Sequence, residues 1–407
     1  MNLSSRLCTV LGRAALVGLG IVLALFAAEG AARVLGSPYE PNDSFYRCDR
    51  WVGWRGLPDL SHPLTTDGYE HRVTRNAAGM HDQAYDPIKP ADTFRILMLG
   101  DSFVEALQVN LEETMQAWLE RDLQPLMPPG KRIEVIAAAS GGWSPSNHLM
   151  YFRGEGQTFQ PDLVLVLWVP ENDLSDILPE SRLTHQGVNC YAPYFVLCDG
   201  AFDPGPWFSA PGIPPTSREC SLARKRLVSF LNRLYQISHL YQRLEPFLTG
   251  YYHKLEYSNP YAPWLQQAQG DPALKYAYQL TDGVYASLAQ EAAAAGAPTA
   301  FVIVPSKRAL QVKEDPTYLD ELQDAGMEAG GSVVDVTLSN QRFTALMAQR
   351  HLPTLDLFPL FLDRLKAGQG PLYWQTDTHW NVEGNRMAAE LIARWLVASD
   401  LVPTETE

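Results

Sequence analysis

The sequence predicts an α/β protein, built as a three-layer α/β/α sandwich around a parallel sheet. Short apolar runs recur along the chain, as is typical of buried strands. Stretches with helical periodicity separate these runs, and strands that alternate with helices form a parallel sheet covered on both faces. The chain has 407 residues, of which 46% are hydrophobic. That length is enough for one large domain or two smaller ones with real cores.

The first element is an apolar stretch, residues 7–28, which only Arg13 interrupts. The whole stretch approaches the ~20 residues that a membrane-spanning helix needs. Its uninterrupted part, residues 14–28, has the length typical of the apolar region of a signal peptide. Arg6 and Arg13 predict that the amino terminus stays in the cytoplasm and that the body is exported. We favour an uncleaved signal anchor over residues 1–36, with a cleaved signal as the alternative.

Composition narrows the class of partner. The formal net charge is −14, and an acidic surface repels phosphate backbones, so nucleic acid is not an expected partner. Closely spaced cysteine or histidine pairs of the zinc-binding kind do not occur, so neither a metal nor a cofactor is predicted. Four cysteines follow the apolar stretch and would permit two disulfides in an oxidising compartment, with the pairing open and free thiols as the alternative. They are Cys48, Cys190, Cys198 and Cys220.

Residues 37–93 are rich in proline, aspartate, glycine and aromatic residues and show little periodicity. They predict an irregular segment that lies over the following domain. The domain itself is predicted over residues 94–400. Its first three strands are expected at residues 95–99, 133–139 and 163–169, with helices at about 112–126 and from about 146.

The alternation of strands and helices stops at residues 174–270, which predicts an insertion after the third strand. Within it, residues 222–244 carry apolar side chains at helical spacing, with arginine and lysine on the opposite face. Packing on the domain is the favoured role of this helix, and a membrane surface or an anionic substrate is the alternative. The alternation then resumes with a helix at 273–294, strands at 299–304 and 332–336, a helix from about 340, a loop at 368–380 and a closing helix at 383–397.

Four groups of residues follow strands or precede the last helix. Because the carboxyl ends of parallel strands meet at one edge of a sheet, we expect these groups to converge. Taken singly, each has an ordinary structural explanation, such as a turn or a structural histidine. Their joint occurrence in this order predicts one site. The groups are Ser102 after the first strand, Gly141 and Gly142 after the second, Asn172 after the third, and Asp377-Thr378-His379-Trp380-Asn381 before the last helix.

These residue types suit acyl chemistry. A serine hydroxyl is a weak nucleophile until a base takes its proton, and His379 can take the proton of Ser102. Asp377 can orient the imidazole and stabilise its charged form. The tetrahedral intermediate needs hydrogen-bond donors for its oxyanion. The Ser102 backbone N–H, a glycine N–H after the second strand and the Asn172 amide are suitable donors.

At this point the chain resembles the SGNH, or GDSL-type, hydrolases. Their first block matches Gly100-Asp101-Ser102-Phe103. Their second block, a glycine after strand two, matches Gly142 best, because the residues that follow lead directly into a helix; Gly141 is the alternative. Their third block, Gly-x-Asn-Asp, appears at residues 170–173 with proline in place of its glycine, and it contains Asn172.

The last block departs from the family's usual spacing, which places the aspartate three residues before the histidine. Here Asp377 precedes His379 by two residues within Asp-Thr-His-Trp. This spacing resembles a subgroup of exported proteins that O-acetylate alginate and similar polysaccharides. The resemblance covers most of residues 75–400 apart from the insertion.

The resemblance implies a flavodoxin-like sheet and a serine esterase or deacylase that works through an acyl-enzyme. One alternative is an O-acyltransferase that passes the acyl group to an exported polysaccharide. Another is a non-catalytic carbohydrate-binding component of a polysaccharide-export complex. The substrate would be an acylated small molecule or polysaccharide, with Asp101, Trp143 and Trp380 as candidate contacts. Five tryptophans could stack on sugar rings, with core packing as the alternative for each: Trp143, Trp207, Trp264, Trp374 and Trp380.

Overall fold

A five-stranded parallel sheet forms the centre of the protein. The computed structural model describes residues 3–35, 45–178, 192–208, 272–315, 318 and 335–405, and scattered positions within 226–244. The strands lie in the order β11-β10-β7-β5-β6, and each neighbouring pair is parallel. Their bounds are β5 Thr93–Gly100, β6 Arg132–Ala139, β7 Leu163–Trp168, β10 Thr299–Ile303 and β11 Thr354–Asp356.

The strand order identifies the edge where a ligand would bind. The first strand of the sheet, β5, lies between the second, β6, and the third, β7. The chain therefore changes direction across the sheet at β5, and in open α/β sheets the crevice at such a switch point binds ligands. This is the strand order of flavodoxin-like folds. The fold class predicted from the sequence is confirmed.

Helices cover both faces of the sheet, and alternate residues of each strand point to opposite faces. In β5, Ile96 and Met98 pack under one layer, whereas Leu97 and Leu99 pack under the other, and all four are fully buried. The first layer consists of α3 Met115–Leu123, α10 Lys307–Glu314, α13 Phe358–Lys366 and α14 Val382–Ala398. The second layer consists of α4 Pro145–Gly154, α9 Pro272–Ala294 and α12 Leu338–Gln349.

The fifth strand is not where the sequence places it. Of the predicted strand at 332–336, residues 332–334 lie outside the described residues, and Asp335 and Val336 are not in a strand. The strand is β11, which has only three residues and follows Pro353. A run that short shows no periodicity. Helix α13, Phe358–Lys366, which follows β11 directly, was also missing from the predicted elements.

The segment before the sheet contains regular structure where an irregular chain was predicted. Strands β1 Tyr46–Asp49 and β2 Gly53–Gly56 form one antiparallel hairpin, and β3 Ser61–Thr66 and β4 Tyr69–Thr74 form another. Asp67 and Gly68, with φ of 51° and 83°, make the tight turn of the second hairpin. An Asp-Gly pair between threonine-rich runs is a hairpin signal, and it could have corrected the prediction.

The predicted insertion is described only in part. Its strands β8 Pro193–Cys198 and β9 Ala201–Phe208 form a hairpin against α4 and α9. Most of the helix predicted at 222–244 lies outside the described residues. Cys48 and Cys198 are both disulfide-bonded.

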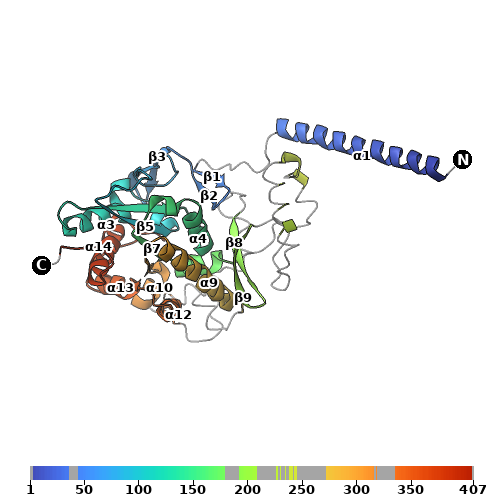
Figure 1. Cartoon of the computed structure of the whole chain (residues 1–407). Coiled ribbons are helices and arrows are strands. Elements are labelled where there is room, and N and C mark those ends of the chain that lie inside the picture. Colours follow the sequence, from blue (N-terminus) through green and yellow to red (C-terminus); the bar gives the residue numbers. More distant parts are fainter. Residues whose placement is uncertain are drawn as a thin grey trace.

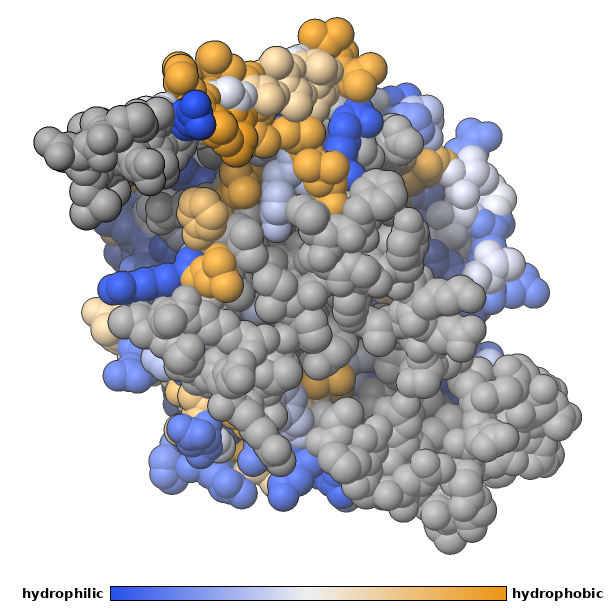
Figure 2. Space-filling view, turned by 90° about the vertical axis from the view of Figure 1, so that its right-hand side faces the viewer, coloured by the Kyte–Doolittle hydropathy of each residue, from blue (hydrophilic) through white to orange (hydrophobic). Residues whose placement is uncertain are grey.

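The amino-terminal helix α1, Leu3–Val34, extends away from the body (Figure 1). Within the part of the chain that the structure describes, one helix is long and apolar enough to cross a membrane, at Ala15–Val34. Its large apolar side chains between Leu16 and Phe26 are 47–72% exposed. Figure 2 shows hydrophobic residues gathered at the upper end of this face, where Figure 1 places α1.

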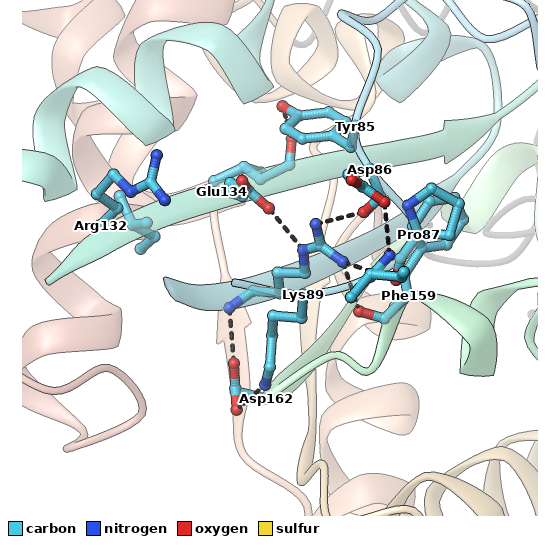
Figure 3. Close-up of polar contacts among 12 residues, drawn as sticks. Tyr85, Asp86, Pro87, Lys89, Arg132, Glu134, Phe159 and Asp162 are labelled. Carbon is cyan, nitrogen blue, oxygen red and sulfur yellow. Dashed lines mark hydrogen bonds and ion pairs between the residues drawn. The ribbon is translucent and has the colours of Figure 1, made fainter. Parts of the chain in front are cut away.

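A buried arginine, Arg95, supports the end of the sheet opposite the carboxyl ends of the strands, and Figure 3 labels its partners, among them Glu134 and Phe159. The guanidinium of Arg95, in β5, is fully buried. It donates to a carboxylate oxygen of Glu134 at 2.5 Å and to the backbone oxygens of Asp86 at 2.5 Å, Phe159 at 2.9 Å and Pro87 at 3.2 Å. One side chain therefore ties the segment before β5 to β6 and to the loop before β7. Because it lies at the amino end of β5, it supports the sheet without reaching the ligand-binding edge.

Replacing Arg95 with methionine should lower the free energy of unfolding by about 3 kcal/mol or more, because it leaves a carboxylate and three carbonyls without their buried donor. The matched control is Arg132→Met on the neighbouring strand. The Arg132–Asp92 ion pair has side chains that are 58% and 49% exposed, so its loss should cost less than about 1 kcal/mol. Urea unfolding of both variants measures the difference. Equal, small losses would show that the Arg95 contacts contribute little.

Candidate active site

Ser102 begins the short helix α2, Ser102–Glu105, directly after β5. The turn into this helix requires a glycine, because a Cβ on Gly100 would lie 2.3 Å from a methyl group of Val104. Ala106 ends the helix in the left-handed conformation, with φ of 49°. The hydroxyl of Ser102 is thus placed at the carboxyl edge of the sheet, next to the switch point between β5 and β7.

The Asp101 carboxylate accepts hydrogen bonds from two residues. One carboxylate oxygen accepts the Phe103 N–H at 2.9 Å and so caps α2, while the other accepts the Asn172 amide at 2.7 Å. Burial raises the pKa of Asp101, and the hydrogen bonds from Phe103 and Asn172 oppose that rise. Asn172 lies in α5, Pro170–Asp176, which follows β7. The side chains after β5 and β7 are therefore joined directly.

The loop before α14 brings a histidine and an aspartate to Ser102. His379 Nε2 lies 2.6 Å from Ser102 Oγ. The other ring nitrogen, Nδ1, is hydrogen-bonded to a carboxylate oxygen of Asp377, which also accepts the His379 backbone N–H at 2.8 Å. The spacing of two residues allows this double contact within one turn. The structure thus brings Ser102, His379 and Asp377 into one hydrogen-bonded chain.

The electrostatics of this chain favour an ionised aspartate. Burial alone would raise the pKa of Asp377, but hydrogen bonds and charge interaction with His379 outweigh burial and hold the pKa below its usual value. A carboxylate that stays ionised can stabilise an imidazolium beside it. Gln108 adds a contact that the sequence did not indicate, because its amide nitrogen lies 3.4 Å from Asp377 Oδ2 and 3.2 Å from His379 Nδ1.

Two charged side chains hold the loop that carries Asp377. Lys307, the first residue of α10, donates to the backbone oxygens of Trp374 at 2.6 Å, Gln375 at 2.8 Å and Asp377 at 3.1 Å. Asp67, in the turn of the β3–β4 hairpin, accepts the backbone N–H of Gln375 at 2.5 Å. Both residues are distant from Asp377 in sequence and match no motif, so sequence reasoning missed them.

The two glycines after β6 differ in their contacts. The Gly141 N–H donates to the Glu105 carboxylate at 2.6 Å, so it is not available to a substrate. The N–H of Gly142 has no hydrogen-bond partner among the described residues. Gly142 has a φ of 72°, a left-handed conformation that glycine adopts without strain. Of the two candidates, the contacts therefore favour Gly142 as a donor to a bound group.

Glu105 is a further residue that the sequence did not single out. Its buried carboxylate accepts hydrogen bonds from Arg75 at 2.6 Å and from the Tyr46 hydroxyl at 2.8 Å, in addition to the Gly141 N–H. Burial raises the pKa of Glu105, and the charge of Arg75 opposes the rise. The carboxylate therefore joins the helix that begins at Ser102 to the loop after β6 and to the segment before the sheet.

The three candidate substrate contacts predicted from the sequence are core residues. Trp143 is fully buried, and its indole donates to the Trp54 backbone oxygen at 2.8 Å. Trp380 is 2% exposed and packs against Phe103 with a ring separation of 5.1 Å. Asp101 is 1% exposed. A side chain without exposed surface cannot stack on or bind a sugar, so core packing, the alternative for both tryptophans, is what the structure contains.

The other predicted sugar-stacking tryptophans differ among themselves. Trp207 is also buried, and Trp264 lies outside the described residues. Trp374, five residues before His379, is partly exposed and stacks on Tyr69 with a ring separation of 5.4 Å.

Removing the Lys307 ammonium should loosen the loop that carries Asp377, because three carbonyls lose a charged donor. In Lys307→Met we expect amide hydrogen exchange of residues 374–379 to rise about tenfold or more. Lys313→Met, at an exposed position of the same helix, is the matched control and should leave exchange in the loop unchanged. Equal exchange in the two variants would show that Lys307 does not hold the loop.

One comparison with known proteins matches the carboxyl-terminal part of the chain to a family model. Residues 264–406 match the family model described as "SGNH hydrolase-like domain, acetyltransferase AlgX". The matched part contains Asp377 and His379, whereas Ser102 precedes it. The comparison with curated proteins gave no match.

Several solved structures are similar at low identity. One is an acetyl xylan esterase, AlAXEase, at 12% identity over 76% of this chain and 100% of the other, with a TM-score of 0.38. A psychrotrophic esterase, EstA, from Pseudoalteromonas sp. has 13% identity over 76% and 99%, with a TM-score of 0.34. A catalytic mutant of an acetylxylan esterase from Geobacillus stearothermophilus has 12% identity over 76% and 96%, with a TM-score of 0.36. Over residues 264–406 the chain resembles the SGNH hydrolase-like domain of the AlgX acetyltransferase family.

Proposed function

We propose that the protein is an exported, membrane-anchored serine esterase or deacylase of the SGNH type. Ser102 is the nucleophile, His379 the general base and Asp377 the residue that orients His379. The observation that carries this proposal is the 2.6 Å contact between Ser102 Oγ and His379 Nε2, with Asp377 bonded to the other ring nitrogen. A base within hydrogen-bond reach of a hydroxyl, itself oriented by a third group, is the arrangement that activates a nucleophile.

The reaction follows from this geometry. His379 Nε2 takes the hydroxyl proton as Ser102 Oγ attacks the ester carbonyl carbon, and the ionised Asp377 stabilises the imidazolium that forms. Collapse of the tetrahedral intermediate breaks the ester C–O bond, and His379 returns the proton to the departing alcohol. The acyl group is then bound to Ser102. In the second half, His379 takes a proton from a water molecule as its oxygen attacks the acyl-enzyme. The bond between the acyl carbon and Ser102 Oγ then breaks, His379 returns the proton to Ser102 Oγ, and the acid leaves.

Three N–H donors would stabilise the oxyanion of the intermediate. They are the backbone N–H of Ser102, the backbone N–H of Gly142 and the side-chain amide of Asn172. An amide nitrogen carries two N–H groups. One N–H of Asn172 is committed to Asp101 at 2.7 Å, which fixes the plane of the amide and leaves the second for the substrate. Preorganised donors of this kind act on charge that develops only in the transition state.

An extracytoplasmic location is part of the proposal. Helix α1 is apolar, and its span Ala15–Val34 is long enough to cross a bilayer. Arg6 and Arg13 at its amino end favour a cytoplasmic amino terminus. Disulfide bonds at Cys48 and Cys198 suit an oxidising compartment. We propose that residues 1–36 form a signal anchor and that the hydrolase-like domain lies outside the cytoplasm.

A second candidate function is O-acyl transfer to an exported polysaccharide. The match of residues 264–406 to a family described as an acetyltransferase favours it. The first half-reaction would be the same, and a sugar hydroxyl would replace water in the second. A non-catalytic carbohydrate-binding role in an export complex is the third hypothesis. The contact between Ser102 and His379 argues against it, because a protein that only binds sugar does not need an activated hydroxyl.

Replacing Ser102 with alanine should reduce cleavage of a short-chain aryl ester to background, since the hydroxyl forms the acyl-enzyme. Ser287→Ala is the matched control, because Ser287 is a partly exposed serine on α9 whose hydroxyl bonds only within its helix; it should keep full activity. Release of the aryl alcohol is measured with and without an oligosaccharide acceptor. Acylated sugar as the main product would favour transfer over hydrolysis. A folded Ser102→Ala protein with normal turnover would rule out the triad.

Replacing Asn172 with alanine should lower kcat by about 10²–10³-fold, the usual effect of losing one oxyanion donor, and should change KM much less. Alanine is a better test than aspartate, because aspartate would place a second carboxylate against Asp101. Thermal unfolding of the same samples separates a catalytic effect from a loss of structure. A folded variant with unchanged kcat would remove Asn172 from the site.

A further inference from the structure

We infer that Trp54 is a positioning residue of the proposed oxyanion site, because its indole orients the peptide that carries the Gly142 N–H. This inference rests on the proposed function. Trp54 lies in β2, far from the motifs in sequence, and is 3% exposed. Its Nε1–H donates to the backbone oxygen of Gly141 at 2.8 Å.

One peptide group links the Trp54 indole to the Gly142 N–H. The oxygen of Gly141 and the N–H of Gly142 belong to the same planar peptide group. That peptide bond is trans. In a trans peptide the C=O and the N–H point in opposite directions. A partner that holds the Gly141 oxygen therefore sets the direction of the Gly142 N–H. Without that partner, the left-handed glycine would let the plane rotate.

The peptide on the other side of Gly141 is held independently. Its N–H donates to the Glu105 carboxylate at 2.6 Å, and Glu105 is the last residue of the helix that begins with Ser102. The loop after β6 is thus fixed relative to the nucleophile through Glu105. The Trp54 indole contacts the next peptide, Gly141–Gly142, and restricts its rotation. The Glu105 contact therefore holds the loop after β6 against the helix of Ser102, whereas the Trp54 contact orients one peptide within that loop.

A second tryptophan supplies a matched control. The Trp143 indole donates to the Trp54 backbone oxygen, also at 2.8 Å, and Trp143 is likewise buried. Its bond ties the loop to β2, but it makes no contact with the Gly141–Gly142 peptide through that group. Replacing either tryptophan with phenylalanine removes one buried indole N–H and the hydrogen bond that it donates to one carbonyl. Only the change at Trp54 frees the peptide that presents Gly142.

The experiment compares Trp54→Phe with Trp143→Phe in the full chain, with Ser102→Ala in the same assay. Both tryptophan variants should lower the unfolding temperature by similar amounts. Trp54→Phe should also lower kcat by about 10–100-fold with little change in KM, because a small misplacement of a transition-state donor is costly. Trp143→Phe should keep kcat within about threefold of the unchanged protein, as expected of a change that leaves every transition-state contact in place.

Phenylboronic acid gives a readout that a merely structural role would not affect. Its boron accepts a lone pair from Ser102 Oγ while His379 takes the hydroxyl proton, and the tetrahedral adduct places a boronate oxygen where the oxyanion would lie. Its affinity should fall in Trp54→Phe by about the same factor as kcat/KM and stay unchanged in Trp143→Phe. If Trp54→Phe does not fold, benzothienylalanine at position 54 removes the N–H while keeping the ring shape.

Equal effects of the two tryptophan changes on kcat and on boronate affinity would overturn the inference, and so would the absence of any effect at Trp54. The proposed function fails in a different way. It fails if Ser102→Ala still cleaves the ester, whatever the tryptophan variants do. An inactive Ser102→Ala together with indistinguishable tryptophan variants would leave the triad standing and remove only the role of Trp54.

Discussion

The candidate site depends on one buried carboxylate, that of Glu105. A buried charge is tolerated only when it is fully paired, and this one accepts hydrogen bonds from Arg75, Tyr46 and the Gly141 N–H. These partners come from three separate parts of the chain, and Glu105 itself ends the helix that starts at Ser102. Because burying this carboxylate without its partners would be costly, the hairpins before the sheet, the loop after β6 and the helix that starts at Ser102 are expected to form together. Residues 45–75 are consequently a part of the site and not a covering placed over it.

The loop that carries His379 is held by a similar principle. His379 and Ser102 are 277 residues apart, so no local structure can position one against the other. Instead, two charged side chains form hydrogen bonds with the backbone of the loop. Lys307 donates to three carbonyls, and Asp67 accepts a backbone N–H. Backbone groups in a loop need partners, and supplying them from α10 and from the β3–β4 hairpin converts an irregular segment into a rigid one. Catalytic groups need such rigidity more than they need regular secondary structure.

The sequence predicted those features that leave a local signal. Four of the five strands were found because they are long and apolar, and Ser102 and Asn172 became site candidates because they follow such strands. β11 was missed because three residues show no periodicity. Trp143 and Trp380 were assigned to substrate because composition does not distinguish a buried indole from an exposed one; only tertiary packing does. The supporting residues could not be found in the same way, since each acts through a partner distant in sequence: Asp67, Glu105, Gln108 and Lys307.

The burial of the tryptophans also bears on whether the acyl group would pass to water or to a sugar hydroxyl. The proposed acyl-enzyme on Ser102 is the same species in both reactions, so the proposed triad cannot decide between them. The choice depends on whether a sugar hydroxyl or water reaches the acyl group, and a sugar needs a surface to rest on. Of the five tryptophans predicted to stack on sugars, Trp143, Trp207 and Trp380 are enclosed in the core, and Trp264 lies outside the described residues. Trp374 is partly exposed, stacks on Tyr69, and donates its backbone N–H to the oxygen of His379 at 3.1 Å. The sugar-stacking hypothesis therefore reduces, for these residues, to one ring whose position is fixed relative to the proposed base.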